Sequence, residues 1–136
     1  MAKAIIKAAW VSINAVDRSA NASKVELTIE YEEKDSTVFT SNGAKEVLGG
    51  LEGSKLGVTF KNDHAVGALD DAMWALRGLV VPFAVRLSSA AVSTSNPQYG
   101  GSVLIGSWTP ISGSPGDLNE ASYNWTASGL ITRVTA

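Results

Sequence analysis

The segment KVELTIEYEEK, residues 24–34, carries the clearest strand pattern in the chain. Apolar and polar side chains alternate along it with a period of two residues, which is the period of a β-strand with one face buried. The apolar positions are Val25, Leu27, Ile29 and Tyr31, and the polar positions are Glu26, Thr28, Glu30 and Glu32. The segment therefore predicts a half-buried strand whose exposed face is acidic.

Further strands are predicted on both sides of this segment. Residues 4–16 are rich in Ile, Val and Trp, and the turn-like residues 17–23 separate them from residues 24–34. We expect these two apolar runs to pair as a hairpin. Downstream, apolar side chains alternate again over residues 56–60. Between them, residues 35–55 mix short apolar pieces with flexible glycine-bearing turns, which predicts a long loop or a protruding hairpin.

One helix is predicted after these strands. Leu69, Met73 and Leu76 follow the i, i+4, i+7 spacing of a helix face, and Trp74 lies beside them on the core side. Gly78 occupies the C′ position, where the left-handed conformation that ends many helices favours glycine. A single helix must pack its apolar stripe against the sheets.

The remaining residues predict more strands and complete the fold. Alternation resumes over residues 81–87, where Pro82 lacks a backbone donor, so we expect this strand to begin at a sheet edge or a bulge. Residues 103–111, 121–127 and 130–135 follow. The prediction is a single domain over residues 1–136. It is mainly β: a β-sandwich or partly open barrel of about seven or eight strands, with one flanking α-helix and a long hairpin loop.

Composition predicts a subunit of an assembly. Only 18% of the 136 residues are charged, 45% are hydrophobic and the net charge is −2. The last fifty residues, 87–136, contain only Asp117, Glu120 and Arg133 as charged side chains. A soluble monomer usually has a more highly charged surface, and open sheet edges invite pairing with another chain. We therefore expect a homo-oligomer in which copies cover one another.

Several function classes are disfavoured. The chain has no cysteine and one histidine, His64, so neither a thiolate site nor a Ser-His-Asp arrangement is easily assembled. We expect His64 to be structural or exposed, and Asp70 and Asp71 to form a solvated helix face. The segment at residues 49–55 lacks the Gly-Lys-Ser/Thr ending of a phosphate loop. We predict no enzyme, no cofactor and no metal.

The N-terminus predicts neither a secretory signal nor a membrane span, because polar residues interrupt its apolar run. Eleven basic residues against thirteen acidic ones give no footprint for gripping nucleic acid. The acidic face of residues 24–34 has two interpretations. It is either a solvated strand face or a carboxylate-lined surface that lets DNA pass without sticking.

The four tryptophans support a second hypothesis. We expect Trp74 and Trp125 to pack in the core, whereas Trp10 and Trp108 remain candidates for an exposed sugar-binding platform. A virion decoration protein or a carbohydrate-binding β-sandwich module is therefore the alternative to an assembly subunit.

The C-terminal third resembles a known family. Residues 96–101 (NPQYGG), 114–118 (SPGDL), Trp125 and residues 128–133 (SGLITR) are similar to the ending of tail tube, or major tail, proteins of long-tailed bacteriophages. The order of parts is similar as well. It comprises a first strand pair, a long glycine-bearing hairpin loop, a strand, one helix, an Asn-Pro loop and a closing strand pair.

This resemblance implies a structural virion protein that forms hexameric rings. The rings stack into a hollow tail tube around a tape-measure protein, between a tail tip and a tail terminator, and later conduct genomic DNA without binding it specifically. No membrane is involved, and assembly in the host cytoplasm precedes residence in the virion tail. Unlike the acidic lumens typical of the family, the candidate wall here is interrupted by lysines. The implied lumen residues are Glu26, Thr28, Glu30 and Glu32, and the implied inter-ring loop contains Phe39, Asn42, Gly43, Glu46, Gly50, Glu52 and Gly53.

Overall fold

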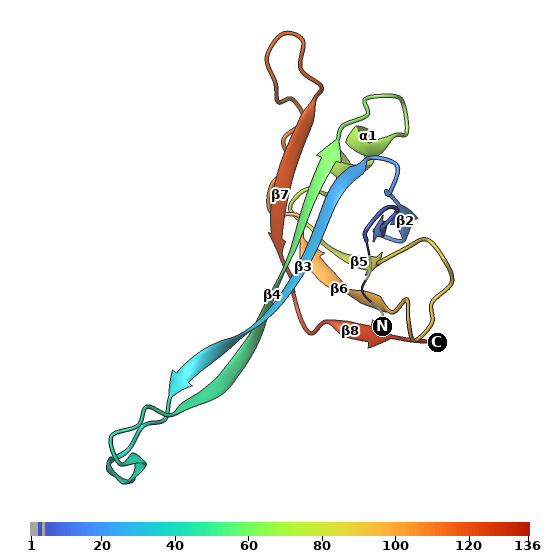
Figure 1. Ribbon diagram of the computed structural model, residues 1–136. Helices are drawn as coiled ribbons and strands as arrows, with labels where there is room; N and C mark the ends of the chain where they lie inside the picture. The colour runs from blue at the N-terminus through green and yellow to red at the C-terminus, as the bar shows by residue number, and fades with distance from the viewer. Residues whose placement is uncertain (1–2, 4) are drawn as a thin grey trace.

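A computed structural model describes residues 3 and 5–136 of the chain (Figure 1). These residues form eight strands, one α-helix and one short 3-10 helix. The strands are β1 (Trp10–Ile13), β2 (Val16–Asp17), β3 (Ala22–Asp35), β4 (Val47–Lys61), β5 (Val80–Arg86), β6 (Gln98–Leu104), β7 (Glu120–Thr126) and β8 (Thr132–Val134), and the helices are η1 (Phe39–Ser41) and α1 (Leu69–Leu76).

Two antiparallel sheets make up the body of the molecule. One has five strands in the order β2-β1-β5-β6-β8, and the other has three in the order β3-β4-β7. Every pairing between neighbouring strands is antiparallel, and among the described residues neither sheet closes on itself. The mainly β fold with eight strands and one helix is therefore confirmed, in its sandwich form and not as a closed barrel.

The core lies between the sheets because β1, β4, β5, β6 and β7 each turn buried apolar side chains inward. Leu56, Val58 and Phe60 of β4 alternate inward as predicted, and Trp125 of β7 is only 2% exposed. An aromatic row continues from Trp125 through Tyr123, whose ring centroids are 5.1 Å apart. The other buried apolar side chains are Val11, Ile13, Leu69, Met73, Val81, Phe83, Val85, Val103 and Ile105.

The predicted hairpin between the first apolar run and residues 24–34 is wrong. β1 pairs with β2 and β5 in the five-stranded sheet, whereas β3 pairs with β4 in the other. The cause is a tight turn at Asn14 and Ala15, which both adopt left-handed backbone angles, with φ values of 54° and 64°. Two successive left-handed residues form the turn that matches strand twist in a two-residue hairpin. The chain therefore reverses inside the apolar run.

Helix α1 contains the predicted apolar positions and ends before Gly78 as predicted, but its N-cap is Ala68 and not the expected Asn62 or Asp63, and one side chain points the other way. Leu69 and Met73 are fully buried, and Gly78 follows the helix with a φ of 78°. Trp74, expected in the core, is 53% exposed. Its ring is covered by the guanidinium of Arg77, 3.9 Å from the ring centroid, so a cation–π contact takes the place of core packing.

Pro82 lies in a central strand and not at an edge, contrary to the prediction. β5 has β1 on one side and β6 on the other. The Pro82 carbonyl accepts a hydrogen bond from the amide of Asn14 (2.7 Å), so its backbone groups face the point where β1 ends. The missing N–H therefore falls beyond the β1 ladder, and no pairing between these strands is lost.

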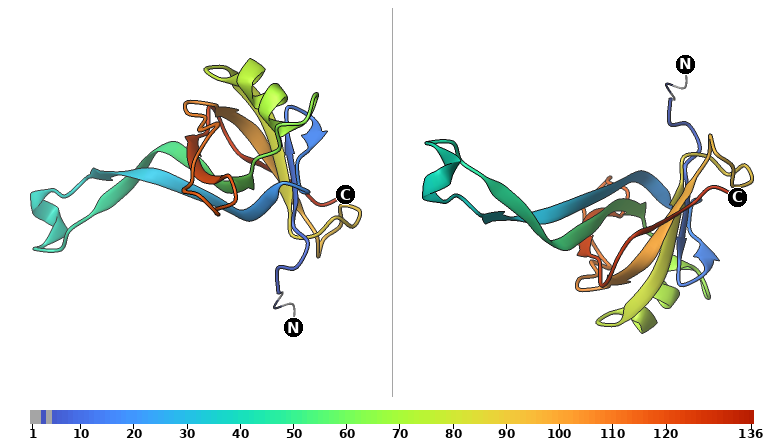
Figure 2. Two further views of the ribbon diagram at one scale, coloured as in Figure 1. Left: turned by 90° about the horizontal axis from the view of Figure 1, so that it is seen from above. Right: turned by 90° about the horizontal axis from the view of Figure 1, so that it is seen from below.

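The β3 and β4 strands run far beyond the two sheets as a long hairpin, which we call the arm, residues 30–52 (Figures 1 and 2). This confirms the predicted protruding hairpin. Only residues 36–46 form its tip, however, and Gly50, Glu52 and Gly53 lie in β4 and not in a loop. Turn-forming glycines suggested a longer loop, but cross-strand pairing continues through them with a bulge between Tyr31 and Glu33.

Candidate assembly surfaces

The three-stranded sheet has an unpaired strand at each margin, β3 on one side and β7 on the other. Backbone bonds show which groups point outward. The amide of Ala127 donates to the carbonyl of Ser54 (2.8 Å), and that of Lys61 donates to the carbonyl of Asn21 (2.7 Å). Backbone groups alternate sides along a strand. Even-numbered residues of β4 therefore bond toward β7, and odd-numbered residues bond toward β3.

The strand register shows which residues of β3 and β7 point their backbone groups toward the open edges of the sheet. In β3, the residues opposite odd-numbered β4 positions use their backbone groups within the sheet, and the intervening residues present theirs to the margin. The same reasoning applies to β7. The outward-facing backbone groups belong to Val25, Leu27, Ile29 and Tyr31 of β3, and to Glu120, Ser122, Asn124 and Thr126 of β7. Each edge is a row of free donors and acceptors.

The face of this sheet that points away from the core is wholly polar. Glu26, Thr28 and Glu30, three of the four predicted lumen residues, lie on it together. Glu32 lies beyond the sheet on the arm, 3.4 Å from Lys34. The face holds the side chains of Lys24, Glu26, Thr28, Glu30, Lys55, Thr59, Lys61, Glu120, Ser122, Asn124 and Thr126.

Lysines balance the glutamates on this polar face. Lys55 lies between Thr28 and Thr126 in register. Lys24 is 3.9 Å from Glu26, and Lys61 is 3.8 Å from Glu120. The face therefore carries three lysines and three glutamates. The polar side of β3 taken alone is acidic, but β4 and β7 contribute cations to the sheet face that the pattern in β3 does not contain.

The base of the arm is tied to the C-terminal segment through one carboxylate. Glu52 accepts hydrogen bonds from the hydroxyl of Tyr31 (2.9 Å) and from the amide of Ile131 (3.0 Å). The accepting carboxylate raises the pKa of Tyr31, because losing the phenol proton would break this bond and set two negative charges together. Glu52 thus serves as an anchor at the arm base and not as a loop residue.

The tip of the arm is an ordered turn with an exposed apolar end. The Asp35 carboxylate accepts a hydrogen bond from the amide of Thr37 (2.9 Å). The Thr37 side chain and then its amide, as hydrogen-bond donors, lower the pKa of Asp35. Across the turn, the Thr37 hydroxyl donates to the carbonyl of Glu46 (3.2 Å) and accepts from the amide of Glu46 (2.8 Å). Left-handed angles at Asn42 (φ 55°) and Gly43 (φ 81°) complete the reversal.

Apolar side chains are exposed along the whole arm. Phe39, at the tip, is 104% exposed, which means that no other side chain shields it. A soluble protein seldom leaves so many large apolar groups in one place without a partner. The exposed apolar side chains of the arm are Tyr31, Val38, Phe39, Val47, Leu48 and Leu51, with Ile29 at its base.

A cluster of hydrogen-bonded polar side chains connects helix α1 to the loop that precedes β7. Asp70 accepts hydrogen bonds from the indole of Trp108 (3.1 Å) and the amide group of Asn62 (3.3 Å). Asn119 contacts Nε2 of His64 at 2.8 Å and donates to the Pro110 carbonyl at 2.8 Å. Asp70 is therefore a structural acceptor and not part of a solvated face, whereas Asp71 is exposed.

The tryptophans are engaged within the chain. Trp108 stacks on Tyr123 with ring centroids 5.1 Å apart, and Trp125 is buried as predicted. The guanidinium of Arg86 lies 4.0 Å from the centroid of the Trp10 ring. A sugar-binding surface needs bare, neighbouring aromatic faces, and each of these rings already has a partner on at least one face.

Residues 3 and 5–136 hold no cluster of three or more histidine, aspartate or glutamate side chains that could bind a metal ion. In the same part of the chain, no helix has the length and apolar character needed to cross a membrane.

Comparison with known proteins identifies the fold. The sequence matches no known protein family and no curated protein. The structure is similar to a chain of a solved assembly described as the virion of a native gene transfer agent (GTA) particle, with a TM-score of 0.72 and 16% sequence identity. The alignment covers 93% of this chain and 95% of that one. The two chains therefore share a fold over nearly their whole lengths.

Proposed function

We propose that this protein is a structural virion subunit that assembles into stacked rings, forming the hollow tail tube through which genomic DNA passes. The observation that carries the proposal is the pair of unpaired edges on one small sheet, combined with an arm that reaches away from it. The similarity to a chain from a gene transfer agent virion supports a place in a virion. The sequence resemblance to tail tube proteins supports the tail.

Ring formation follows from the two edges. β3 and β7 are both antiparallel to β4, so they run in the same direction at opposite margins of the sheet. If β7 of one copy pairs with β3 of the next, the contact is a parallel strand pair and joins different surfaces head to tail. Such heterologous contacts close into a ring when the rotation between copies permits. The resemblance implies six copies.

The polar face of the three-stranded sheet would line the channel. It carries charge of both signs in equal number and many hydroxyl and amide groups. A surface without net positive charge releases few counterions from DNA and so holds it weakly. In this arrangement the tape-measure protein would occupy the channel before ejection, and the tail tip and terminator proteins would close its ends.

Electron microscopy of the purified protein tests the proposal. We expect hollow filaments with a regular axial repeat, formed alone or after seeding with tail tips. Lone particles that persist at high concentration in the presence of a seed would contradict it.

The channel assignment has its own test in assembled particles. Glu26→Lys with Glu30→Lys changes the face from three lysines against three glutamates to five against one, so DNA should stick and ejection should slow. The matched variant with glutamine at both positions removes the carboxylates without adding cations and should eject faster than the lysine variant. Equal ejection rates for the two variants would place these residues elsewhere.

A further inference from the structure

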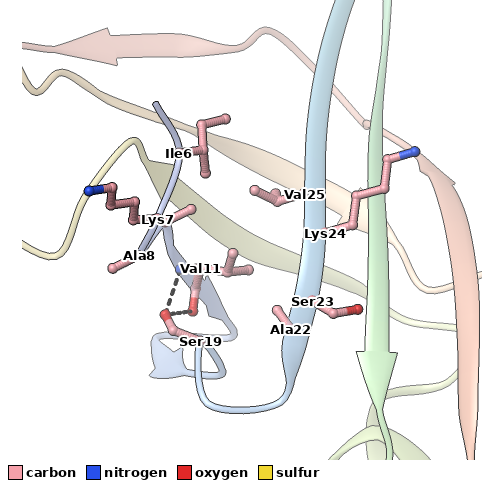
Figure 3. Close-up of a pocket in the computed structure, with 10 residues that line it drawn as sticks. Ile6, Lys7, Ala8, Val11, Ser19, Ala22, Ser23, Lys24 and Val25 are labelled. Atoms are coloured by element: carbon pink, nitrogen blue, oxygen red, sulfur yellow. Dashed lines mark hydrogen bonds between the residues drawn. The ribbon is translucent and has the colours of Figure 1, made fainter. Parts of the chain in front are cut away.

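The charged side chains on the polar face of the three-stranded sheet follow a fixed order along its strands. The side chain of Lys24 extends to the side of β3 opposite Val25, which packs against the core (Figure 3). Residues paired across β3, β4 and β7 form rows across this face, and successive rows are two residues apart. The rows, in order along β3, hold Lys24 with Thr59 and Ser122, then Glu26 with Gly57 and Asn124, then Thr28 with Lys55 and Thr126, and then Glu30 with Gly53.

Each of these four rows contains a single charged side chain, and the sign alternates from row to row. In order, the charged residues are Lys24, Glu26, Lys55 and Glu30. A further row, beyond that of Lys24, pairs Lys61 with Glu120 at 3.8 Å and has no net charge. Neighbouring rows of this face therefore always differ in net charge.

The rows are close enough together for opposite charges to offset one another in salt. Two residues along a strand span about 6.8 Å, whereas charges at physiological ionic strength are screened over about 8 Å. A mobile charge that faces a lysine row is therefore also within range of a glutamate row. If the same charges were sorted into a positive half and a negative half, the outer lysine row would lie about 13.6 Å from the nearest row of negative net charge, beyond the screening length.

We propose that the order of the charges along the strands, in addition to their number, prevents the channel from holding DNA. The inference rests on the proposed tube. In a closed ring, cyclic symmetry repeats each residue at one height, so the copies together form belts of like charge, and successive belts alternate in sign. Duplex DNA carries one negative charge for about every 1.7 Å of its axis. Its phosphates therefore face belts of both signs at every stage of passage, and attraction and repulsion offset each other as it slides.

A charge exchange within the face tests the order while keeping the number of charges constant. Glu26→Lys with Lys55→Glu leaves three lysines and three glutamates on the face but arranges the rows as positive, positive, negative, negative. The matched control, Lys61→Glu with Glu120→Lys, exchanges two charges inside the neutral row and leaves the alternation unchanged. Electron microscopy first establishes that both variants form tubes of normal length, and the rate of DNA ejection from assembled particles is then measured.

We expect the exchange between rows to slow ejection at least about tenfold, because two adjacent lysine belts present many phosphate contacts at once. The control should eject within about twofold of the unmodified particle, because a neutral row adds no phosphate attraction. Raising the salt concentration should restore the rate of the slowed variant, because screening shortens the reach of the lysine belts.

A second exchange, Lys24→Glu with Glu30→Lys, sorts the charges in the opposite direction and should also slow ejection in a salt-dependent way. It provides an independent test if the first variant does not assemble. Normal ejection by tubes with sorted charges, equal slowing of the control, or slowing that salt does not relieve would overturn the inference and leave the tube intact. Failure of the unmodified chain to form tubes would overturn the proposed function and this inference with it.

Discussion

Replacing Ile29 with proline tests edge pairing with little disturbance of the subunit. The N–H of Ile29 points to the free margin of β3, so a proline there removes no hydrogen bond within the sheet. Extended backbone accommodates the proline ring at an edge strand. The Ile29→Ala variant shortens the side chain and keeps the N–H, so the difference between the two variants isolates one outward donor.

The size of the effect follows from that single hydrogen bond. One backbone hydrogen bond contributes about 0.5–1.5 kcal/mol net, and a buried carbonyl left without its donor adds to the loss. The cost recurs at every contact around a closed ring. We therefore expect Ile29→Pro to require at least tenfold more protein for assembly than Ile29→Ala, while the melting temperatures of the two dispersed subunits stay close.

Glu30→Pro provides the opposite control. The backbone of Glu30 faces β4 opposite Gly53, so proline there removes a bond inside the subunit and should lower its stability directly. Sedimentation velocity across a concentration series measures assembly, and thermal unfolding measures the subunit. Assembly of Ile29→Pro at the same concentration as Ile29→Ala would refute pairing through the β3 edge.

Three further predictions concern the subunit itself. The hydroxyl of Ser54 is buried without a hydrogen-bond partner in the described part of the chain, so Ser54→Ala should raise the unfolding free energy by about 1 kcal/mol, measured with urea. Met73→Ala should lower the unfolding free energy by about 2–5 kcal/mol because Met73 is fully buried, whereas Trp74→Ala should lower it by less than about 1 kcal/mol. Equal losses for the two variants would contradict the orientation of α1. Asp70→Asn should lower stability by about 1–2 kcal/mol, because the amide replaces a charged acceptor of the Trp108 indole; an unchanged urea midpoint would show that the cluster is dispensable.

Much of the fold could be predicted because local patterns and tertiary burial agree. Alternation in the first half of β3, in the last residues of β4 and in β7 matches their inward and outward faces, and the spacing of Leu69 and Met73 places α1 against the core. Ile29 and Tyr31 continue the pattern of β3 but are exposed on the arm and at its base. The protruding hairpin was also predictable, since glycines near its end favour turns. Its true length was not, because pairing across Gly50 and Gly53 depends on the opposite strand and not on local preference.

The errors arise where the alternation of apolar and polar residues carries no signal. A tight turn at Asn14 and Ala15 sends β1 to the other sheet, and no glycine marks it. Trp74 points outward, where Arg77, three residues later, covers its ring, although its neighbour Met73 is buried. The balanced charge of the polar face depends on Lys55 of β4 lying beside Thr28 of β3. The sequence of either strand alone does not indicate that these two residues are neighbours.

Hydrogen exchange, followed by mass spectrometry with fragmentation to single amides, tests the central claim that neighbouring copies complete the open sheet. The amides of Val25, Leu27, Ile29 and Tyr31 face outward and should exchange quickly in dispersed subunits, whereas those of Glu26 and Thr28 should be protected. On assembly, the account predicts strong new protection at the four outward amides. Unchanged exchange at these positions in well-formed tubes would contradict it.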